Sequence, residues 1–264
     1  EMCIRDRIGG GFGRRLDIDG VEYAVRIARH VNVPVQVIYS REQDIRHDRY
    51  RPCYLDHIEA ELDSSGTPIR WSHKISGGSA TLAWDGKPLP KGIDGDVVEG
   101  SANLPYDFKN IDVRYIQVEP QAIPISWWRG VGPTRSVLVV ESFIDELANL
   151  VKADPIEYRL RWLKPERARR VLQVVKALSN WGQPLAPGYG RGVSLHAEFG
   201  SFMAQAVEVY ISDHTVQVKR IYSVMDCGLA VNPDQVKAQI EGGSIFGLTA
   251  ALYGEVTLKN GQVE

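Results

Sequence analysis

The sequence predicts an α+β protein in which mixed sheets pack against separate helices. Residues 53–62 and 68–76 are strand-like and are joined by Ser-Ser-Gly, which is typical of a hairpin. Residues 134–153 form the clearest helix of the chain, with apolar side chains nearly all round, and are expected to lie inside the protein. Helix-like and strand-like stretches do not alternate regularly, so a repeating βαβ architecture is not indicated.

The first half of the chain is expected to contain one early helix followed mainly by strands. Asp17 and Asp19 can cap a helix whose apolar side chains recur at helical spacing as far as Val31. The β-branched run at residues 33–39 predicts a buried strand. The other elements expected in this half are the hairpin, long loops over 77–110 and a strand near 111–119.

The second half is expected to begin and end with helices. Pro155 opens a helical stretch that runs to Leu163, and residues 166–180 form an amphipathic helix whose basic face is expected to be solvated. The elements expected after it are a linker-like break at 182–192 and strands at 203–211 and 215–224.

A last helix is expected from about Asp234, and Asp226 and Asn232 are expected to shape the turn that leads into it. Glycine inside a helix costs about 1 kcal/mol relative to alanine, so several glycines there indicate close approach to another group. The glycines of this stretch are Gly242, Gly243, Gly247 and Gly254.

Composition excludes several classes of protein. The chain has 264 residues, of which 44% are hydrophobic and 24% charged, with a net charge of −2, so it is globular and gives no case for a nucleic-acid partner. Three isolated cysteines, Cys3, Cys53 and Cys227, indicate neither a disulfide framework nor a zinc site. No apolar run approaches the roughly 20 residues that a transmembrane helix needs.

Both ends of the sequence suggest a fragment. Residues 1–7 have no periodicity, and we interpret them as an artefactual or disordered end without functional weight. The last residues, VTLKNGQVE, stop just after an Asn-Gly hairpin turn, so a returning strand is expected to be cut short.

Residues 9–17, GGGFGRRLD, raise the first functional question. Glycine lets a backbone approach a ligand closely, and N–H groups before a helix form an anion site. The spacing fits neither the dinucleotide fingerprint, because Arg14 occupies a glycine position, nor the P-loop. Two interpretations remain from this stretch alone: a loop for a polar cofactor group, or a tight turn with incidental arginines.

Four stretches together carry a specific resemblance. They are GGGFGRR, REQDIRHDRYRP (41–52), WWRGVGPTRSVLVVESFIDELA (127–148) and MDCGLAVNPDQVKAQIEGGSIFG (225–247). In this order they resemble the molybdopterin-binding large subunit of the xanthine dehydrogenase/aldehyde oxidase family, in the branch of the isoquinoline 1-oxidoreductase beta subunit. The resemblance covers residues 8–264. It implies part of a CO dehydrogenase molybdoprotein-like fold, with one molybdopterin-binding region at 8–165 and part of a second at 166–264.

The resemblance also implies an activity and its cofactors. Such subunits hydroxylate an aromatic carbon beside a ring nitrogen, or an aldehyde carbon, with oxygen from water. The implied cofactor is a molybdopterin with molybdenum, as the cytosine dinucleotide in this branch. The implied partner is a small 2Fe-2S subunit, since no cluster-type cysteine spacing exists here. The alternatives are an aldehyde dehydrogenase of the same family and a non-catalytic scaffold module.

Site residues follow from the same resemblance. Arg129 matches an arginine whose main chain contacts the cofactor, and its charge could also stabilise a developing oxyanion. The alternative is that Arg129 pairs with a buried carboxylate such as Glu141. The loop at residues 11–13 is expected at the molybdenum end, and no residue is expected to bind the metal directly. The implied cofactor-binding residues are Gly11, Phe12, Gly13, Arg129, Gly130, Gln239, Gly242 and Gly243.

Trp128 and Val131 are expected to line the substrate pocket. Val131 stands where purine enzymes place a stacking phenylalanine, Leu16 stands where they have an acid, and Val97 where they have a substrate arginine. The resemblance therefore implies a small aromatic or aldehyde substrate and not a purine.

One catalytic element of the family is missing. The family uses a glutamate in a G-x-G-E segment as a general base, and this chain contains no such segment. Glu255 and Glu264 lack that context, so the chain alone is expected to be inactive. Localisation stays open between the cytoplasm and export to the periplasm. The cluster of Asp44, His47 and Asp48 is interpreted as a solvated loop.

Overall fold

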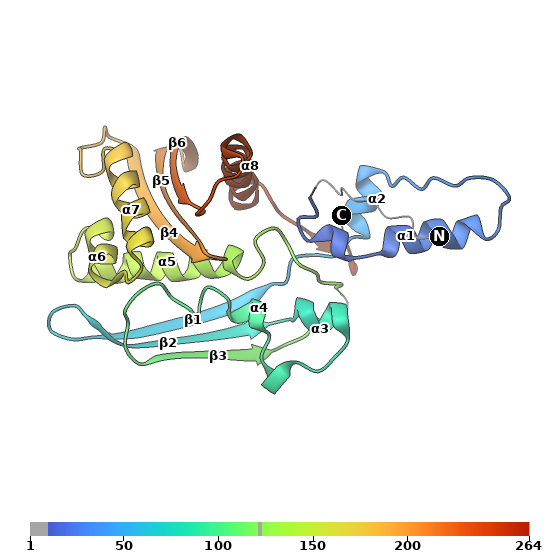
Figure 1. Cartoon of the computed structure of the whole chain (residues 1–264), viewed down its shortest axis with the longest axis horizontal. Helices are drawn as coiled ribbons and strands as arrows, with labels where there is room; N and C mark the ends of the chain where they lie inside the picture. The colour runs from blue at the N-terminus through green and yellow to red at the C-terminus, as the bar shows by residue number, and fades with distance from the viewer. Residues whose placement is uncertain (1–9, 121–122, 264) are drawn as a thin grey trace.

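A computed structural model describes residues 10–120 and 123–263, and Figure 1 shows their arrangement. The expected end at residues 1–7 lies outside the described residues. Two three-stranded sheets are separated by helix α5 (Pro133–Leu150), and a two-helix arm carries the N-terminal part away from both sheets. The predicted α+β class is therefore confirmed.

The first sheet contains the predicted hairpin. Strands β1 (Tyr54–Leu62) and β2 (Pro68–Gly77) pair antiparallel. Their turn is closed by Asp63, whose Oδ1 accepts hydrogen bonds from the N–H groups of Ser65 and Thr67 at 2.8 and 3.0 Å. Strand β3 (Ile111–Gln117) then joins β2 in parallel, which gives the order β1-β2-β3.

The connection from β2 to β3 is more ordered than the expected long loops. It contains α3 (Ala80–Asp85), the short 3₁₀ helix η2 (Pro90–Gly92) and α4 (Gly95–Val98). The side chain of Ser79 caps α3 and that of Asp94 caps α4, and Ser79 also donates to Asp94 at 2.5 Å. Short polar caps thus stabilise helices that are too brief to show a hydrophobic period.

The second sheet is an antiparallel meander of β4 (Tyr189–Glu198), β5 (Ser201–Ser212) and β6 (Thr215–Asp226). Strands β5 and β6 were expected, whereas β4 begins inside the stretch interpreted as a linker. Helices α6 (Pro155–Trp162) and α7 (Glu166–Leu178) follow α5, and α7 packs on β5 and β6.

The core lies where α5, α6 and α7 meet both sheets. Only one side of α5 is buried there, because Leu138 and Leu150 are each 69% exposed, so the expectation of burial all round was wrong. Fully buried apolar side chains of the core include Trp71, Ile144, Ile156, Tyr158, Leu172, Val175, Ala204 and Ala206.

The basic face of α7 was expected to be solvated, and the structure corrects this. Arg167 pairs with Asp226 of β6 at 2.6 Å, and the Nη1 of Arg169 donates to the carbonyl of Leu160. Lys176 pairs with Glu157 of α6. These cations fasten α7 to its neighbours because each reaches an acceptor on an adjacent element.

The N-terminal arm differs most from expectation. Helix α1 (Asp19–Ala28) forms, but its N-cap Ile18 provides no side-chain cap, since Asp17 pairs with Arg49 and Asp19 pairs with Arg14. Residues 33–39 are not a strand, and Ile38 is 78% exposed. A β-branched run becomes a strand only beside another strand, and none of the described residues provides one.

Helix α2 (Arg41–Arg46) follows the arm's extended segment and begins with a capping box between Ser40 and Gln43. At the other end of the chain, α8 (Pro233–Leu252) is capped by Asn232, as expected. A two-stranded ladder of β7 (Leu258–Lys259) and β8 (Gln262–Val263) turns at Asn260 and Gly261. The described part of the chain has no helix long and apolar enough to cross a membrane.

Candidate functional site

The glycine loop packs directly against the Trp127-Trp128 segment. Gly13 has a φ of +98°, and a Cβ at this position would lie 2.2 Å from the carbonyl oxygen of Trp127. Only glycine allows this close contact between two backbones. The neighbouring Arg14 does not offer a free cation, because it pairs with Asp19 at 2.8 Å and Asp48 at 2.6 Å. Its hydrogen bond holds the pKa of Asp19 below the usual range.

The loop before α5 forms a second wall. Gly130 and Val131 both have positive φ, at 92° and 53°, and the hydroxyl of Thr134 donates to the carbonyl of Arg129 at 2.7 Å. At Gly132 a Cβ would lie 1.7 Å from the carbonyl oxygen of Asp96, so the loop is pressed against α4. A β-branched residue at positive φ stores strain of about 1–3 kcal/mol, which is typical of functional loops.

Arg129 joins three distant segments. Its Nη2 donates to the side chain and the carbonyl of Gln239 on α8, at 3.1 and 3.3 Å. Its guanidinium lies over the rings of Phe12 and Phe246, 5.1 and 5.7 Å from their centroids. A Cβ on Gly243 would lie 3.2 Å from Arg129 Nη2, so this helical glycine does approach another group. Arg129 therefore connects the glycine loop to α8.

A pocket of about 490 Å³ lies where these segments meet, a volume typical of small-ligand sites. Trp128 forms part of its wall, and its ring packs against that of Phe246 at a tilt of 33°, with ring centroids 4.9 Å apart. The lining residues are Phe12, Gly13, Leu16, Asp96, Glu99, Trp127, Trp128, Arg129, Gly130, Val131 and Phe199.

The structure brings together most of the predicted site residues. Phe12, Gly13, Gly130 and the two predicted substrate residues line this pocket, and Gln239 and Gly243 reach it through Arg129. Gly11, by contrast, does not line the pocket. Gly242 has open space where a Cβ would stand, so its backbone is accessible to a bound group.

The residues at this pocket fit a phosphate-rich pterin. Such an anionic group needs a guanidinium, exposed glycine backbone and aromatic walls. Arg129 supplies the first, Gly13 and Gly130 supply glycine backbone in the wall, and Phe12 and Trp128 supply the aromatic surfaces. No group of three His, Cys, Asp or Glu side chains within residues 10–120 and 123–263 could hold a metal ion by itself.

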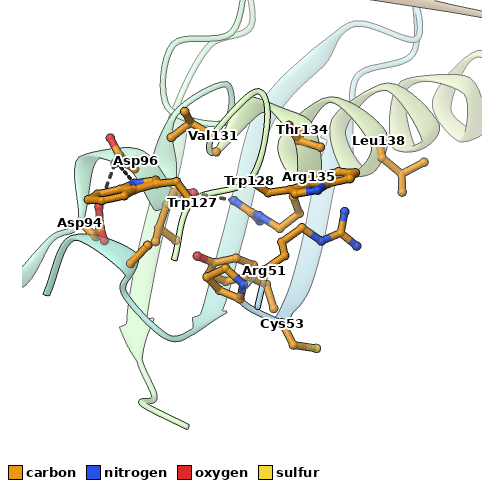
Figure 2. Close-up of a pocket in the computed structure, with 15 residues that line it drawn as sticks. Arg51, Cys53, Asp94, Asp96, Trp127, Trp128, Val131, Thr134, Arg135 and Leu138 are labelled. Carbon is orange, nitrogen blue, oxygen red and sulfur yellow. Dashed lines mark hydrogen bonds between the residues drawn. The ribbon is translucent and has the colours of Figure 1, made fainter. Parts of the chain in front are cut away.

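A second pocket of about 230 Å³ shares Asp96, Trp127, Trp128 and Val131 with the first (Figure 2). The indole N–H of Trp127 donates to Asp96 Oδ2 at 2.6 Å, which fixes the wall between the two pockets. The Arg51 guanidinium lies 4.6 Å from the centroid of the Trp128 ring. The sequence did not predict this pocket because its residues come from four separate segments.

Arg135 forms the polar part of the second pocket. It pairs with Asp56 of β1, donates to the carbonyl of Val97 and lies 4.7 Å from the centroid of the Tyr54 ring. Burial lowers the pKa of Arg135, and burial raises the pKa of Tyr54. These contacts tie α5 to the first sheet directly behind the loop that carries Arg129.

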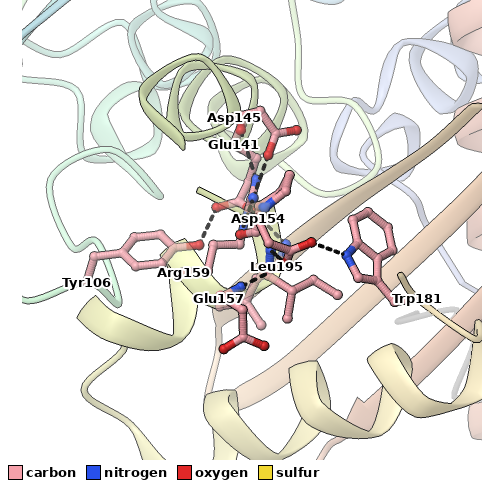
Figure 3. A network of polar contacts seen from close by, with 10 residues as sticks. Tyr106, Glu141, Asp145, Asp154, Glu157, Arg159, Trp181 and Leu195 are labelled. Atoms are coloured by element: carbon pink, nitrogen blue, oxygen red, sulfur yellow. Dashed lines mark hydrogen bonds and ion pairs between the residues drawn. The ribbon is translucent and has the colours of Figure 1, made fainter. Parts of the chain in front are cut away.

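Glu141 pairs with residues other than Arg129, so the alternative pairing with Arg129 was wrong. Figure 3 shows its buried carboxylate, which accepts from the Tyr106 hydroxyl at 2.7 Å, from Arg159 Nε at 2.9 Å and from the Leu195 N–H at 2.7 Å. Burial, and then the charge of Glu141, raise the pKa of Tyr106 well above its ordinary value. Arg159 also pairs with Asp145, and the network joins α5, α6 and β4.

Glu99 is a pocket residue that the sequence interpretation missed. Its Oε2 is buried and has no hydrogen-bond partner among the described residues. Burial, and then the negative charges of Glu198 and Asp96, raise the pKa of Glu99 to about 7. Its position two residues after Val97, where the family's substrate arginine would stand, was the one signal that could have indicated it.

Comparison with known protein families gives two matches, each to a molybdopterin cofactor-binding domain, at residues 2–163 and 178–264. The beta subunit of isoquinoline 1-oxidoreductase from Brevundimonas diminuta is 28% identical over 97% of this chain. A nicotinate dehydrogenase subunit of Pseudomonas putida is 28% identical over 98%. The chain spans 34% and 24% of the lengths of these two relatives.

The fold is also that of a solved molybdenum enzyme. The Cu,Mo-CO dehydrogenase superimposes with a TM-score of 0.58 at 16% identity, over 73% of this chain and 28% of that one. This likeness confirms the predicted CO dehydrogenase molybdoprotein-like fold. The two domain matches confirm what the four motifs indicated. The chain therefore belongs to the molybdopterin cofactor-binding domain family, in the group of the xanthine dehydrogenase and aldehyde oxidase molybdenum subunits.

Proposed function

We propose that this chain is the cofactor-holding core of a molybdenum hydroxylase subunit that oxidises an aromatic carbon beside a ring nitrogen, with water as the oxygen source. The observation that carries the proposal is the contact of Arg129 with both Phe12 and Gln239 beside one pocket. These three residues are distant in sequence and meet only in the fold. The identity to isoquinoline and nicotinate enzymes supports the choice of substrate class.

The cofactor of this proposal is molybdopterin as the cytosine dinucleotide. Gly13, Phe12 and Gly130 would hold its metal end, while Arg129 and the glycines of α8 would hold its anionic part. The bound group supplies the redox centre that takes up two electrons from the substrate. The protein around it excludes water with Phe12 and Trp128 and orients the ring of the substrate.

Substrate size and shape follow from the pocket walls. Trp128 contributes an aromatic edge to the wall, and Val131 adds an aliphatic side chain in place of a stacking ring. A small monocyclic or bicyclic ring suits such an apolar wall. An aldehyde of similar size is the alternative substrate, and a scaffold without catalysis is the alternative function.

The proposal assigns two further parts of the enzyme to other polypeptide chains or segments. Electrons would leave through a small 2Fe-2S subunit, because the three cysteines lack cluster spacing. The general-base glutamate would also come from sequence beyond this chain. We therefore expect no turnover from residues 1–264 alone, and we expect the whole protein to work in the cytoplasm or the periplasm.

The test is turnover by the full-length protein expressed with its small subunit in a host that makes the cofactor. The protein is offered isoquinoline, nicotinate or benzaldehyde in heavy-oxygen water, and the product is analysed by mass spectrometry. The proposal expects heavy oxygen on the carbon beside the ring nitrogen. Oxidation of benzaldehyde alone would support the aldehyde alternative, and a molybdenum-loaded protein with no turnover would support the scaffold.

A further inference from the structure

Glu99 lies in the wall of the larger pocket, and no described residue pairs with its Oε2. Its main chain is fixed, because the Ser136 hydroxyl donates to its carbonyl at 2.6 Å and Gly132 packs against its Cβ. Its Oε2 is buried and has no hydrogen-bond partner among the described residues. Glu99 itself is only half-buried and lines the larger pocket, so its carboxyl group belongs to the wall that a ligand would meet.

The charged groups around Glu99 are already paired with other residues. Asp96 of α4 accepts from Trp127, and Glu198 of β4 accepts from Asn103 at 2.5 Å. Of the nearby cations, Arg129 donates to Gln239, and Arg135 of α5 pairs with Asp56. Burial lowers the pKa of His196, which lies two residues before Glu198 on β4, so this histidine does not add a positive charge at neutral pH.

These surroundings keep a proton on the carboxyl. Two negative neighbours and burial raise its pKa to about 7, and no described cation pairs with it to oppose them. At neutral pH a large share of Glu99 is therefore the neutral acid, which can donate a hydrogen bond. Of the other lining residues, Phe12, Val131 and Phe199 have apolar side chains without a donor, and the proposed function assigns the guanidinium of Arg129 to the cofactor.

We propose that Glu99 is a positioning and specificity residue that donates a hydrogen bond from its carboxylic acid to the ring nitrogen of an N-heteroaromatic substrate. This inference rests on the proposed function. A neutral ring nitrogen has one lone pair and no proton, so it needs a donor and would be repelled by a carboxylate. The same contact fixes which ring carbon lies deepest in the pocket, which is a choice of reaction position.

The test measures binding of isoquinoline and of its carbon analogue naphthalene to the full-length, dithionite-reduced protein, which cannot oxidise either. Quenching of tryptophan fluorescence reports affinity, above the pH at which isoquinoline itself is protonated. Wild-type protein should bind isoquinoline about tenfold more weakly as pH rises through 7, while naphthalene binding stays constant. Stronger isoquinoline binding at high pH would overturn the proposal.

Three variants separate a hydrogen bond from a structural effect. Glu99→Gln keeps a donor and should bind isoquinoline as tightly as the wild type at low pH, without pH dependence. Glu99→Ala should bind isoquinoline without pH dependence, about tenfold more weakly than the wild type does at low pH. Glu198→Gln removes a negative neighbour, so the transition of the wild-type profile should move to lower pH. If both Glu99 variants bound isoquinoline with the same pH dependence as the wild type, the proposal would be overturned.

Glu61→Gln is the matched control, because Glu61 lies on the exposed edge of β1 and pairs with Arg70 at 3.2 Å. It should leave both affinities unchanged. Turnover is measured separately on the same preparations. A wild-type protein that oxidises isoquinoline while its Glu99 variants bind normally would overturn only this inference. A protein that oxidises only aldehydes would overturn the proposed function itself.

Discussion

Single glycines decide whether the walls of the site can meet. At Gly13 the backbone has positive φ, and a Cβ would collide with the carbonyl of Trp127 at 2.2 Å. We expect Gly13→Ala to lower the free energy of unfolding by about 2 kcal/mol. Thermal unfolding measures this. Gly20→Ala on α1, where nothing lies within 4 Å, is the control and should be neutral or slightly stabilising. Equal losses in both variants would contradict the close contact.

We expect Arg129 to contribute more to cofactor binding than to the stability of the fold. Its partners Gln239, Phe12 and Phe246 are partly exposed, and such contacts contribute about 1 kcal/mol or less to stability. Arg129→Ala should therefore melt close to the wild type but retain about tenfold less molybdopterin after purification. Pterin fluorescence after acid oxidation measures the content. Lys237→Ala, which removes an exposed pair with Glu241 on α8, should retain the wild-type amount.

At the scale of elements, one buried carboxylate holds α5, α6 and β4 together. Glu141→Gln would leave the fully buried Arg159 with the half-exposed Asp145 as its remaining ionic partner among the described residues, so we expect a loss of about 3 kcal/mol in unfolding free energy. Asp145→Asn should cost about 1 kcal/mol or less. Urea unfolding measures both losses as shifts of the midpoint, at an unchanged dependence of the free energy on urea concentration. A loss for Glu141→Gln no larger than that for Asp145→Asn would contradict the network.

The contact of α7 with β6 should be sensitive to acid. The hydrogen bond from Arg167, and then that from the Gly228 N–H, lower the pKa of Asp226 to about 2, below the usual 3.8. A carboxyl with a lowered folded-state pKa stabilises the protein above its unfolded value and loses that contribution as pH falls toward 2. The melting temperatures of wild type and Asp226→Asn should differ at pH 7 and converge near pH 2. A constant difference would contradict the pairing.

Elements with a strong local signal were predictable, and those that depend on neighbours were not. The hairpin at β1 and β2 and the long helix α5 have their pattern and their turn or cap in the sequence itself. Residues 33–39 have the composition of a strand but no neighbouring strand among the described residues, so propensity alone failed. The start of strand β4 was missed because its glycines at 190 and 192 suggest a loop, while pairing with β5 decides its structure.

The candidate site was predictable through resemblance and not through local pattern. The motifs identified Phe12, Arg129 and Gln239 separately, and the fold places them in contact. Glu99 belongs to none of the motifs. Its pKa is raised by burial and by the charges of Glu198 and Asp96, and these effects cannot be predicted from the neighbouring sequence. Long-range electrostatics of this kind appear only when the elements are packed.

At the scale of the whole molecule, the central claim is that the two matched regions hold one cofactor between them. The glycine loop and the loop before α5 belong to the first matched region and α8 to the second, and Arg129 joins them through Gln239. The pocket of about 490 Å³ lies beside that junction. A cofactor bound there would contact both regions, which explains why the junction is polar and rich in glycine.

The most direct test is the content of molybdenum and of cytidine monophosphate released by acid hydrolysis. The full-length protein is made with its small subunit in a host able to build the cofactor, and Arg129→Ala is measured alongside it. Our account predicts near-stoichiometric molybdenum and cytidine monophosphate in the wild type and a loss of both in the variant. A soluble, folded wild-type protein that contains neither would contradict it.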